Sequence, residues 1–237
     1  PKYIETSEKI ITVSHTTKRD LIEVYHCPEN KIIVSNNAPT EVYKPMADKD
    51  IVDFKSSHTE GNDYFIFVGS IQPRKNVLTL LQAFEHFKFT HKTSHKLVLI
   101  GRMSWKYSDV SGYLEAMKFK NEVILIPHSS PEVISQWLAS ATALLMVSHY
   151  EGFGVPIVEA LASGTPVICS NISSMPEVAG GGAILVSPQS VEEISNAMYS
   201  LSTDNNLRNE LVEKGQKHIQ QYTWNHAADI IWREIEQ

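Results

Sequence analysis

Short apolar runs alternate along the chain with segments in which apolar residues recur every three or four positions. Continuous apolar runs are typical of strands covered on both faces, and the longer spacing is typical of amphipathic helices. This alternation predicts a doubly wound parallel sheet of the Rossmann-like α/β class. The predicted strands span residues 9–13, 31–35, 64–69, 96–100, 123–126, 143–147, 166–169 and 183–186.

Helical apolar stripes separate several of these strands. One comprises Val77, Leu80, Leu81 and Phe84, and another Ile134, Trp137, Leu138 and Ala141. A third stripe lies at the C-terminus, where it would dock either on this sheet or on another part of the protein; the spacing leaves both open. Its members are Trp224, Ala227, Ile230, Ile231 and Ile235.

Composition excludes several classes of protein. The 237 residues carry a net charge of −6, which disfavours a general binder of nucleic acid. Cys27 and Cys169 give no disulfide framework and indicate a reducing compartment, so we expect a cytoplasmic protein, either free or at the inner membrane surface. No apolar run approaches the ~20 residues of a membrane span. Because the chain begins with Pro1, we expect a piece of a longer protein.

The most informative segment is residues 151–159, which follows the predicted strand 143–147. Gly152 and Gly154 let a ligand approach the backbone, and Pro156 suits the first turn of a helix. The N-terminus of that helix offers N–H groups and a positive dipole end to an anion. Glu151 and Glu159 on either side would repel a phosphate but suit hydroxyl groups. A nucleotide sugar carries phosphates between two groups rich in hydroxyls.

The same segment resembles the E-x7-E signature of retaining glycosyltransferases with the GT-B fold, notably family 4. The resemblance implies that Glu151 lies near the transferred sugar and that Glu159 binds the ribose hydroxyls. Backbone groups of the intervening residues would contact the donor, and these are Gly152, Phe153, Gly154 and Val155.

Residues 67–76 end one strand and open a helix. Gly69 permits a sharp turn, after which Arg74 and Lys75 project near the carboxyl edge of the sheet, where open α/β sheets bind ligands. Two cations beside a helix N-terminus are unfavourable unless an anion is bound there. The segment resembles the family's donor-phosphate motif, although Ser70 stands where many members carry Arg. We therefore expect Arg74, Lys75 and Glu151 to be catalytic, and Gly69 and Ser70 to contact the donor.

Two further strand ends are expected to bracket the nucleotide base. The resemblance assigns this role to the loops containing Gly101, Arg102 and His128, which act largely through backbone groups. Trp105 and Tyr107 resemble a pattern found in relatives that build surface polysaccharides. No metal or cofactor is expected, because the helix dipole and Lys75 can take the electrostatic role. His91 and His95 are spaced like a metal pair, but their surroundings favour a solvated loop.

The resemblance also implies a domain division. Residues 1–36 would be the last βα unit and hinge of an N-terminal domain, with Ser14 capping the helix. Residues 37–222 would form the Rossmann-like donor domain, and 223–237 a helix that crosses back or docks locally. We expect an enzyme that transfers a hexosyl group from UDP-, GDP- or another nucleoside diphosphate sugar to a saccharide or lipid-linked acceptor, with retention.

Two other functions remain open at this point. The chain could be a non-catalytic subunit that binds the sugar nucleotide and needs a separate N-terminal-domain chain. A GT-B phosphorylase is the weaker alternative, because no pyridoxal phosphate lysine site can be located. A dehydrogenase is disfavoured, since no Gly-x-Gly-x-x-Gly follows a strand.

Overall fold

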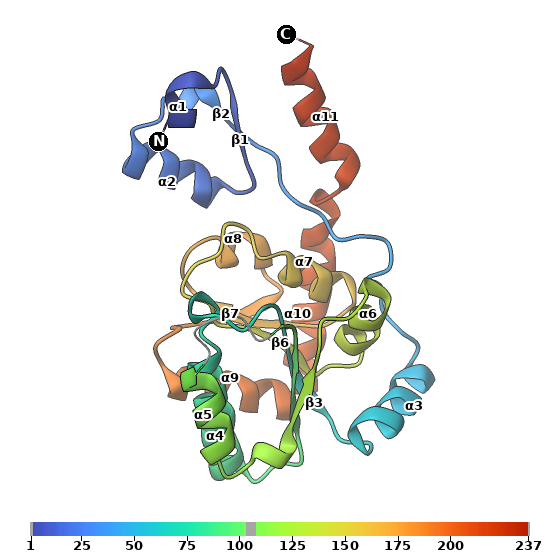
Figure 1. Cartoon of the computed structure of the whole chain (residues 1–237). Helices are drawn as coiled ribbons and strands as arrows, with labels where there is room; N and C mark the ends of the chain where they lie inside the picture. The colour runs from blue at the N-terminus through green and yellow to red at the C-terminus, as the bar shows by residue number, and fades with distance from the viewer. Residues whose placement is uncertain (1, 103–107, 237) are drawn as a thin grey trace.

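The computed structural model describes residues 2–102 and 108–236. Two parallel sheets are present, and the smaller belongs to residues 2–34, called here the N-terminal unit (Figure 1). Its strands pair in register from Ile10 opposite Ile32 to Thr12 opposite Val34. Ser14 accepts a hydrogen bond from the Thr17 amide, so the predicted helix cap is confirmed. The elements are α1 (Lys2–Thr6), β1 (Ile10–Thr12), α2 (His15–Tyr25) and β2 (Ile32–Val34).

The larger sheet has six parallel strands in the order β5-β4-β3-β6-β7-β8. All of the predicted strands are present, with ends within one residue of expectation, and the α/β class is confirmed. The strands are β3 (Tyr64–Val68), β4 (Lys96–Ile100), β5 (Val123–Ile126), β6 (Ala143–Met146), β7 (Val167–Ser170) and β8 (Ala183–Val186).

Helices cover both faces of this sheet and bury two apolar layers, as continuous apolar strands require. Leu80, Leu81 and Phe84 are fully buried against one face, and Leu138 against the other. The first layer is covered mainly by α4 (Val77–His91) and α9 (Val191–Thr203), with α5 (Ser108–Ala116) beside them. The second is covered by α6 (Pro131–Ala139), α7 (Val155–Ala162) and α8 (Met175–Ala179).

The strand order reverses between β3 and β6. From β3 the chain adds β4 and β5 on one side, and from β6 it adds β7 and β8 on the other. The two central strands pair directly, with Phe65 opposite Ala143 and Ile66 opposite Leu144. The loops after β3 and β6 therefore leave the carboxyl edge of the sheet side by side, at the point where open α/β sheets form their binding crevice.

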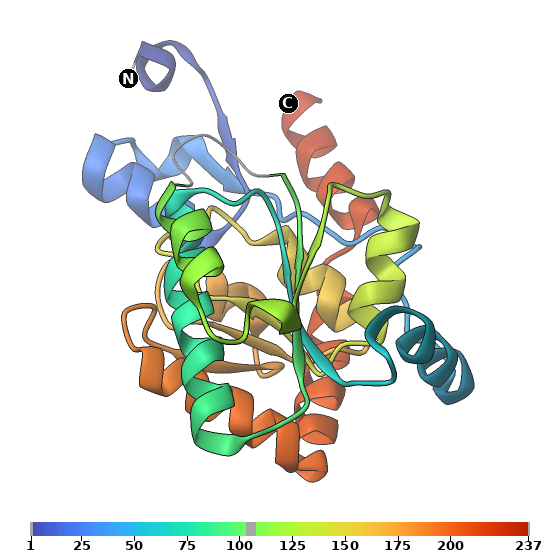
Figure 2. The ribbon, with the colours of Figure 1, turned by 60° about the horizontal axis from the view of Figure 1, so that its bottom comes forward.

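The remaining helices are α3 (Asp48–Thr59), α10 (Asn205–His218) and α11 (Trp224–Ile235). Figure 2 shows α3 at the periphery. In both views α11 extends away from the larger sheet, on the same side as the N-terminal unit. There the Ser35 hydroxyl donates to the Ala227 carbonyl at 3.2 Å, and Lys9 Nζ lies 3.5 Å from a carboxylate oxygen of Glu234. Of the apolar stripe, Ala227 is buried, whereas Trp224 and Ile235 are exposed.

The prediction of a solvated loop around His91 and His95 is wrong. His95 is 8% exposed and its ring stacks on that of Phe65, with centroids 5.3 Å apart. His91 stacks on Tyr199 at 3.8 Å. Both rings also contact Phe87, and the polar sequence around them did not reveal this aromatic packing.

Among the described residues, no helix is both long and apolar enough to cross a bilayer.

Candidate active site

Two glycines bring the ends of β3 and β4 into close contact. Gly101 has φ +153°, and a side chain there would place its Cβ only 2.0 Å from the Gly69 carbonyl oxygen. Gly69 has φ +150°, and its amide donates to the Ile100 carbonyl at 2.9 Å. Gly101 therefore has no room for a side chain, and Gly69 has a φ angle that residues with a Cβ rarely adopt.

The loop after β3 continues into a single 3₁₀ turn, Pro73–Lys75, that ends at Asn76. Asn76 is buried in the left-handed conformation with φ 56°, and its side-chain amide donates to the carbonyls of Val147 and Pro188 at 2.9 and 2.7 Å. These bonds join the loops after β3, β6 and β8. Sequence reasoning did not assign this role to Asn76, although Asn is one of the few residues that tolerate φ above zero.

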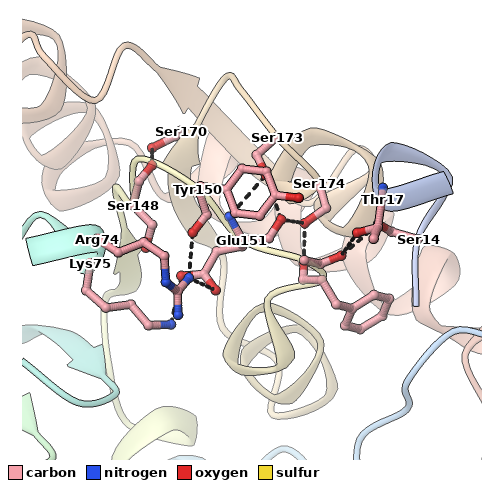
Figure 3. A network of polar contacts seen from close by, with 12 residues as sticks. Ser14, Thr17, Arg74, Lys75, Ser148, Tyr150, Glu151, Ser170, Ser173 and Ser174 are labelled. Carbon is pink, nitrogen blue, oxygen red and sulfur yellow. Dashed lines mark hydrogen bonds and ion pairs between the residues drawn. The ribbon is translucent and has the colours of Figure 1, made fainter. Parts of the chain in front are cut away.

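The three residues predicted to be catalytic meet at this edge, as Figure 3 shows. One carboxylate oxygen of Glu151 lies 2.7 Å from the Arg74 guanidinium, and the other lies 2.7 Å from Lys75 Nζ. Glu151 is 5% exposed and Lys75 is 9% exposed, whereas Arg74 reaches solvent. Arg74 also donates to the Tyr150 carbonyl at 2.5 Å, which holds its guanidinium at the start of the Glu151 loop.

A cavity of about 440 Å³ opens beside this cluster. A Cβ at Gly69 would lie 3.8 Å from Lys75 Nζ, so the ammonium group adjoins the cavity wall. The wall brings together five of the twelve predicted donor-binding residues, which come from the loops after β3, β4 and β5, and it includes Pro156 at the start of α7. The lining residues are Val68, Gly69, Ser70, Ile100, Gly101, Arg102, His128, Ile134 and Pro156.

A larger cavity of about 680 Å³ lies between residues 42–46, α3 and α6. It contains none of the predicted site residues. Convergent charge and the strand ends, rather than volume, identify the smaller cavity as the candidate site.

Helix α7 begins at the cavity with Gly154 as its N-cap, at φ 98°. No side chain caps this helix, Pro156 is in its first turn, and Val155 is partly exposed. Phe153 points the other way, is 3% exposed and makes an edge contact with Tyr222 at 5.5 Å. The aromatic side chain of the motif therefore anchors the loop, and only backbone groups of Phe153 are placed to meet a ligand.

Glu159 is on α7 and half-buried. Burial raises the pKa of its carboxyl, and a hydrogen bond with the Tyr43 hydroxyl acts in the opposite direction. The pKa of Tyr43 is raised in turn by burial and by the charge of Glu159. The two acids of the E-x7-E pattern thus have different surroundings, because Glu151 faces two cations and Glu159 faces a phenol.

Four hydroxyl residues hold the loop that carries Glu151, and sequence reasoning missed all of them. Ser14 and Thr17 of the N-terminal unit donate to the Gly152 carbonyl at 2.7 and 3.1 Å (Figure 3). Ser173 and Ser174, which precede α8, donate to the Glu151 carbonyl in the same loop. Ser14 lies 138 positions from Gly152, so no local pattern could have revealed the contact.

Some positions weighed from the sequence do not contribute to this description. Trp105 and Tyr107 lie outside the described residues. The sequence contains an Asp-x-Asp triplet, a pattern that can bind a metal, at residues 48–50, where it forms the first turn of α3. Asp48 lines a separate cavity with Asp63 and Pro166, at the amino edge of the sheet. No cluster of three His, Cys, Asp or Glu side chains suited to a metal occurs in the part of the chain that the structure describes.

Comparison with known sequences places the chain in a family. The profile of the glycosyl transferases group 1 family matches residues 48–218, well over half of the chain. O-antigen chain mannosyltransferase B of Escherichia coli is 26% identical over 226 residues, which cover 95% of this chain and 59% of that protein. The capsular polysaccharide biosynthesis glycosyltransferase CapM of Staphylococcus aureus is 29% identical over 237 residues, with coverage of 96% and 60%.

Solved structures agree in fold. The Anabaena protein HepE in complex with UDP and glucose has a TM-score of 0.84 at 18% identity, covering 99% of this chain and 63% of that one. Sucrose-phosphate synthase of Thermosynechococcus elongatus has a TM-score of 0.83 at 21% identity, with coverage of 99% and 59%. The chain thus spans about 60% of the length of these relatives. It belongs to the glycosyl transferases group 1 family, and its fold matches one half of a GT-B glycosyltransferase.

Proposed function

We propose that this chain supplies the donor site of a retaining glycosyltransferase, which transfers a hexosyl group from a nucleoside diphosphate sugar to a saccharide or lipid-linked acceptor. One observation carries the proposal. Arg74, Lys75 and Glu151 come from loops 76 residues apart and meet beside a cavity at the reversal of strand order. Family membership supports the reaction class, and the relatives named for mannosyl transfer and capsule synthesis support the acceptor class.

The charges of this cluster suit a diphosphate. Two cations and one carboxylate leave a net positive charge beside the cavity. Lys carries three N–H donors and Arg five, so each can keep its contact with Glu151 and still donate to a phosphate oxygen. As the bond to the sugar breaks, negative charge collects on the diphosphate, and fixed cations stabilise that charge without reorganisation. The start of α7 at Pro156 adds its dipole in the same region.

The carboxylates would bind hydroxyl groups. Arg74 and Lys75 fix the orientation of Glu151, which would accept hydrogen bonds from the transferred sugar while Gly152, Phe153 and Gly154 donate N–H groups. Glu159 would accept from the ribose. In the bound state the diphosphate neutralises much of the cationic charge, and the carboxylates recognise neutral groups on either side of it. No metal is needed for this division of roles.

We also propose that residues 1–36 belong to a second domain, that residues 37–222 form the donor domain, and that 223–237 return to the second domain. The separate sheet of β1 and β2 supports this division. The contacts of α11 with Ser35 and Lys9 support the return.

A thermal-shift panel with UDP, GDP, ADP, dTDP and their sugar nucleotides tests the donor site. A ligand at about a hundred times its Kd stabilises the native state by ~2.7 kcal/mol, which raises Tm by several degrees in a chain of this size. One base should give the largest shift. Glu159→Gln should reduce the shift from the nucleotide, because an amide is a poorer acceptor for the ribose hydroxyls.

Glu151→Gln distinguishes the role of Glu151 from that of Glu159. It should leave affinity for the nucleoside diphosphate within a few fold but sharply lower transfer, measured with the full-length enzyme. The matched control is Glu213→Gln, an exposed acid on α10. Wild-type shifts and wild-type transfer in both site variants would refute the assignment, as would the absence of a shift with every nucleotide tested on the full-length enzyme.

A further inference from the structure

Three consecutive carbonyl groups of the Glu151 loop are bound by side-chain hydroxyls. The Glu151 carbonyl accepts from Ser173 at 2.6 Å and from Ser174 at 2.8 Å. The Gly152 carbonyl accepts from Ser14 and Thr17. The Phe153 carbonyl lies 3.0 Å from the Ser174 oxygen, so the single Ser174 proton is shared between the Glu151 and Phe153 carbonyls. These four hydroxyls, called here the hydroxyl clamp, come from two elements, the start of α2 and the turn before α8. All four contact carbonyl groups of the loop (Figure 3).

Fixing these carbonyls also fixes the amides that follow them. In a planar trans peptide, the C=O of one residue and the N–H of the next point in opposite directions. The clamp therefore directs the N–H groups of Gly152, Phe153 and Gly154 away from the hydroxyls. Within the described residues, none of these amides donates a hydrogen bond, whereas the Glu151 amide donates to Ser173 at 3.0 Å. The clamp thus presents a row of free donors.

The clamp hydroxyls bind the loop even where they could instead make a local hydrogen bond, such as a helix cap. Ser174 occupies the N-cap position of α8, but its side chain makes no cap bond there. Its hydroxyl is fully buried and contacts the Glu151 and Phe153 carbonyls instead. Ser173 adopts a left-handed conformation with φ 60° while its hydroxyl bonds both backbone groups of Glu151. The left-handed backbone of Ser173 and the absence of a cap bond from Ser174 both indicate that the shape of this loop is closely specified.

The start of α2, which carries Ser14 and Thr17, is itself bound to α8. Glu177 of α8 accepts from the backbone amides of His15 and Thr16 at 2.8 and 3.0 Å, and from the Thr16 hydroxyl at 3.1 Å. A carboxylate at a helix N-terminus binds free amides and complements the dipole. Helix α8 therefore sets the position of α2, and α2 in turn places Ser14 and Thr17 on the Gly152 carbonyl.

We propose that Ser14 and Thr17 are positioning residues, through which the N-terminal unit orients the amides of residues 152–154 toward the sugar of the donor. This inference rests on the proposed function for the identity of the ligand. The hydroxyls contact the loop on the carbonyl side and act through it, without touching the donor. Displacement of the N-terminal unit would release the Gly152 carbonyl and let that peptide rotate, so the donor-sugar contacts would depend on where α2 lies.

Thr17→Val is the decisive variant, because it removes one hydroxyl and keeps the Ser14 cap and the shape of the side chain. We expect affinity for the sugar nucleotide to fall by roughly three- to tenfold, the range for one hydrogen bond, while affinity for the nucleoside diphosphate stays within about twofold. Thr17→Ser should restore the ratio of the two dissociation constants. Thr6→Val, a matched change of an exposed hydroxyl in α1, should leave the ratio unaltered.

Calorimetric titration of the full-length enzyme measures both constants. An unchanged ratio of the two dissociation constants in Thr17→Val would overturn the proposal, whether or not both ligands bind more weakly. A purely structural residue would affect both ligands alike.

A second readout needs no ligand. In ¹H–¹⁵N spectra, the amide resonances of residues 152–154 should shift in Thr17→Val and return in Thr17→Ser. If they do not move, the positioning role is wrong even where nucleotide binds. If they move but no nucleotide binds the wild type, the orientation of the loop is supported and the proposed function fails instead.

Discussion

Acid should destabilise this protein through His95, whose ring is buried at the amino edge of the sheet. Burial lowers the pKa of His95 to about 4 from its ordinary 6.5. The charge of Asp63 acts to raise this pKa, whereas Lys88, Arg208 and Lys55 act to lower it further. Neither ring nitrogen has a hydrogen-bond partner among the described residues, so no hydrogen bond there stabilises the protonated ring, and burial outweighs the charge of Asp63. The native state therefore holds His95 neutral under conditions where the unfolded chain protonates it.

The sign and size of the effect follow from linkage. Between pH 6.5 and about 4 the unfolded state binds the extra proton, so the free energy of unfolding falls as the pH falls. The full difference is about 2.5 pKa units, or ~3 kcal/mol, and it is complete below pH 4. Between pH 7 and pH 5 the contribution of His95 is ~2 kcal/mol.

Urea unfolding at pH 7, 6 and 5 measures this loss, and His95→Phe isolates it from carboxylates that titrate nearby. Phenylalanine has a similar shape and keeps the stacking on Phe65 and the edge contact with Phe87. The variant should lose ~2 kcal/mol less stability than the wild type between pH 7 and pH 5. It should also be more stable at pH 7 by about 1 kcal/mol, because two unpaired buried nitrogens are removed.

Parallel stability curves for the wild type and His95→Phe would refute the argument, since they would mean that the ring is protonated as easily in the native state as in the unfolded chain. A direct check is the titration of the His95 ring by NMR. A midpoint near 6.5 would contradict the burial argument. His95 lies at the amino edge and the candidate site at the carboxyl edge, so nucleotide affinity at pH 7 should not change in the variant.

Three further changes test the framework of the site. Gly101→Ala should destabilise the protein by ~3 kcal/mol and abolish nucleotide binding, because its Cβ would lie 2.0 Å from the Gly69 carbonyl oxygen; a wild-type urea midpoint would contradict this. Asn76→Ala should cost ~2 kcal/mol in the same assay, since two carbonyls lose their amide donor. Glu177→Ala should cost ~1 kcal/mol and speed proteolytic release of residues 1–36, which unchanged cleavage kinetics would argue against.

The elements and the edge that carries the site could be predicted from the sequence. An apolar run or a helical stripe reflects burial over a few residues, so β3 or α4 is encoded where it occurs. Parallel strands also share one carboxyl edge, which placed Gly69, Gly101 and Glu151 in the same region before any contact was known. The family resemblance, carried by Glu151 and Glu159, added the class of ligand.

Only the tertiary structure decided which side chains meet at that edge. Arg74 and Lys75 bind Glu151 because β3 and β6 are neighbours, and strand order depends on the packing of the whole sheet. Ser14 and Thr17 reach Gly152 from the N-terminal unit, and the ring of His95 is buried against Phe65 of β3 and Phe87 of α4. The local hydrophobic pattern reflects which face of each segment is buried. Contacts between segments depend on how all of the segments pack together. The sequence by itself therefore determined the scaffold and the place of the site, and the tertiary structure decided its partners.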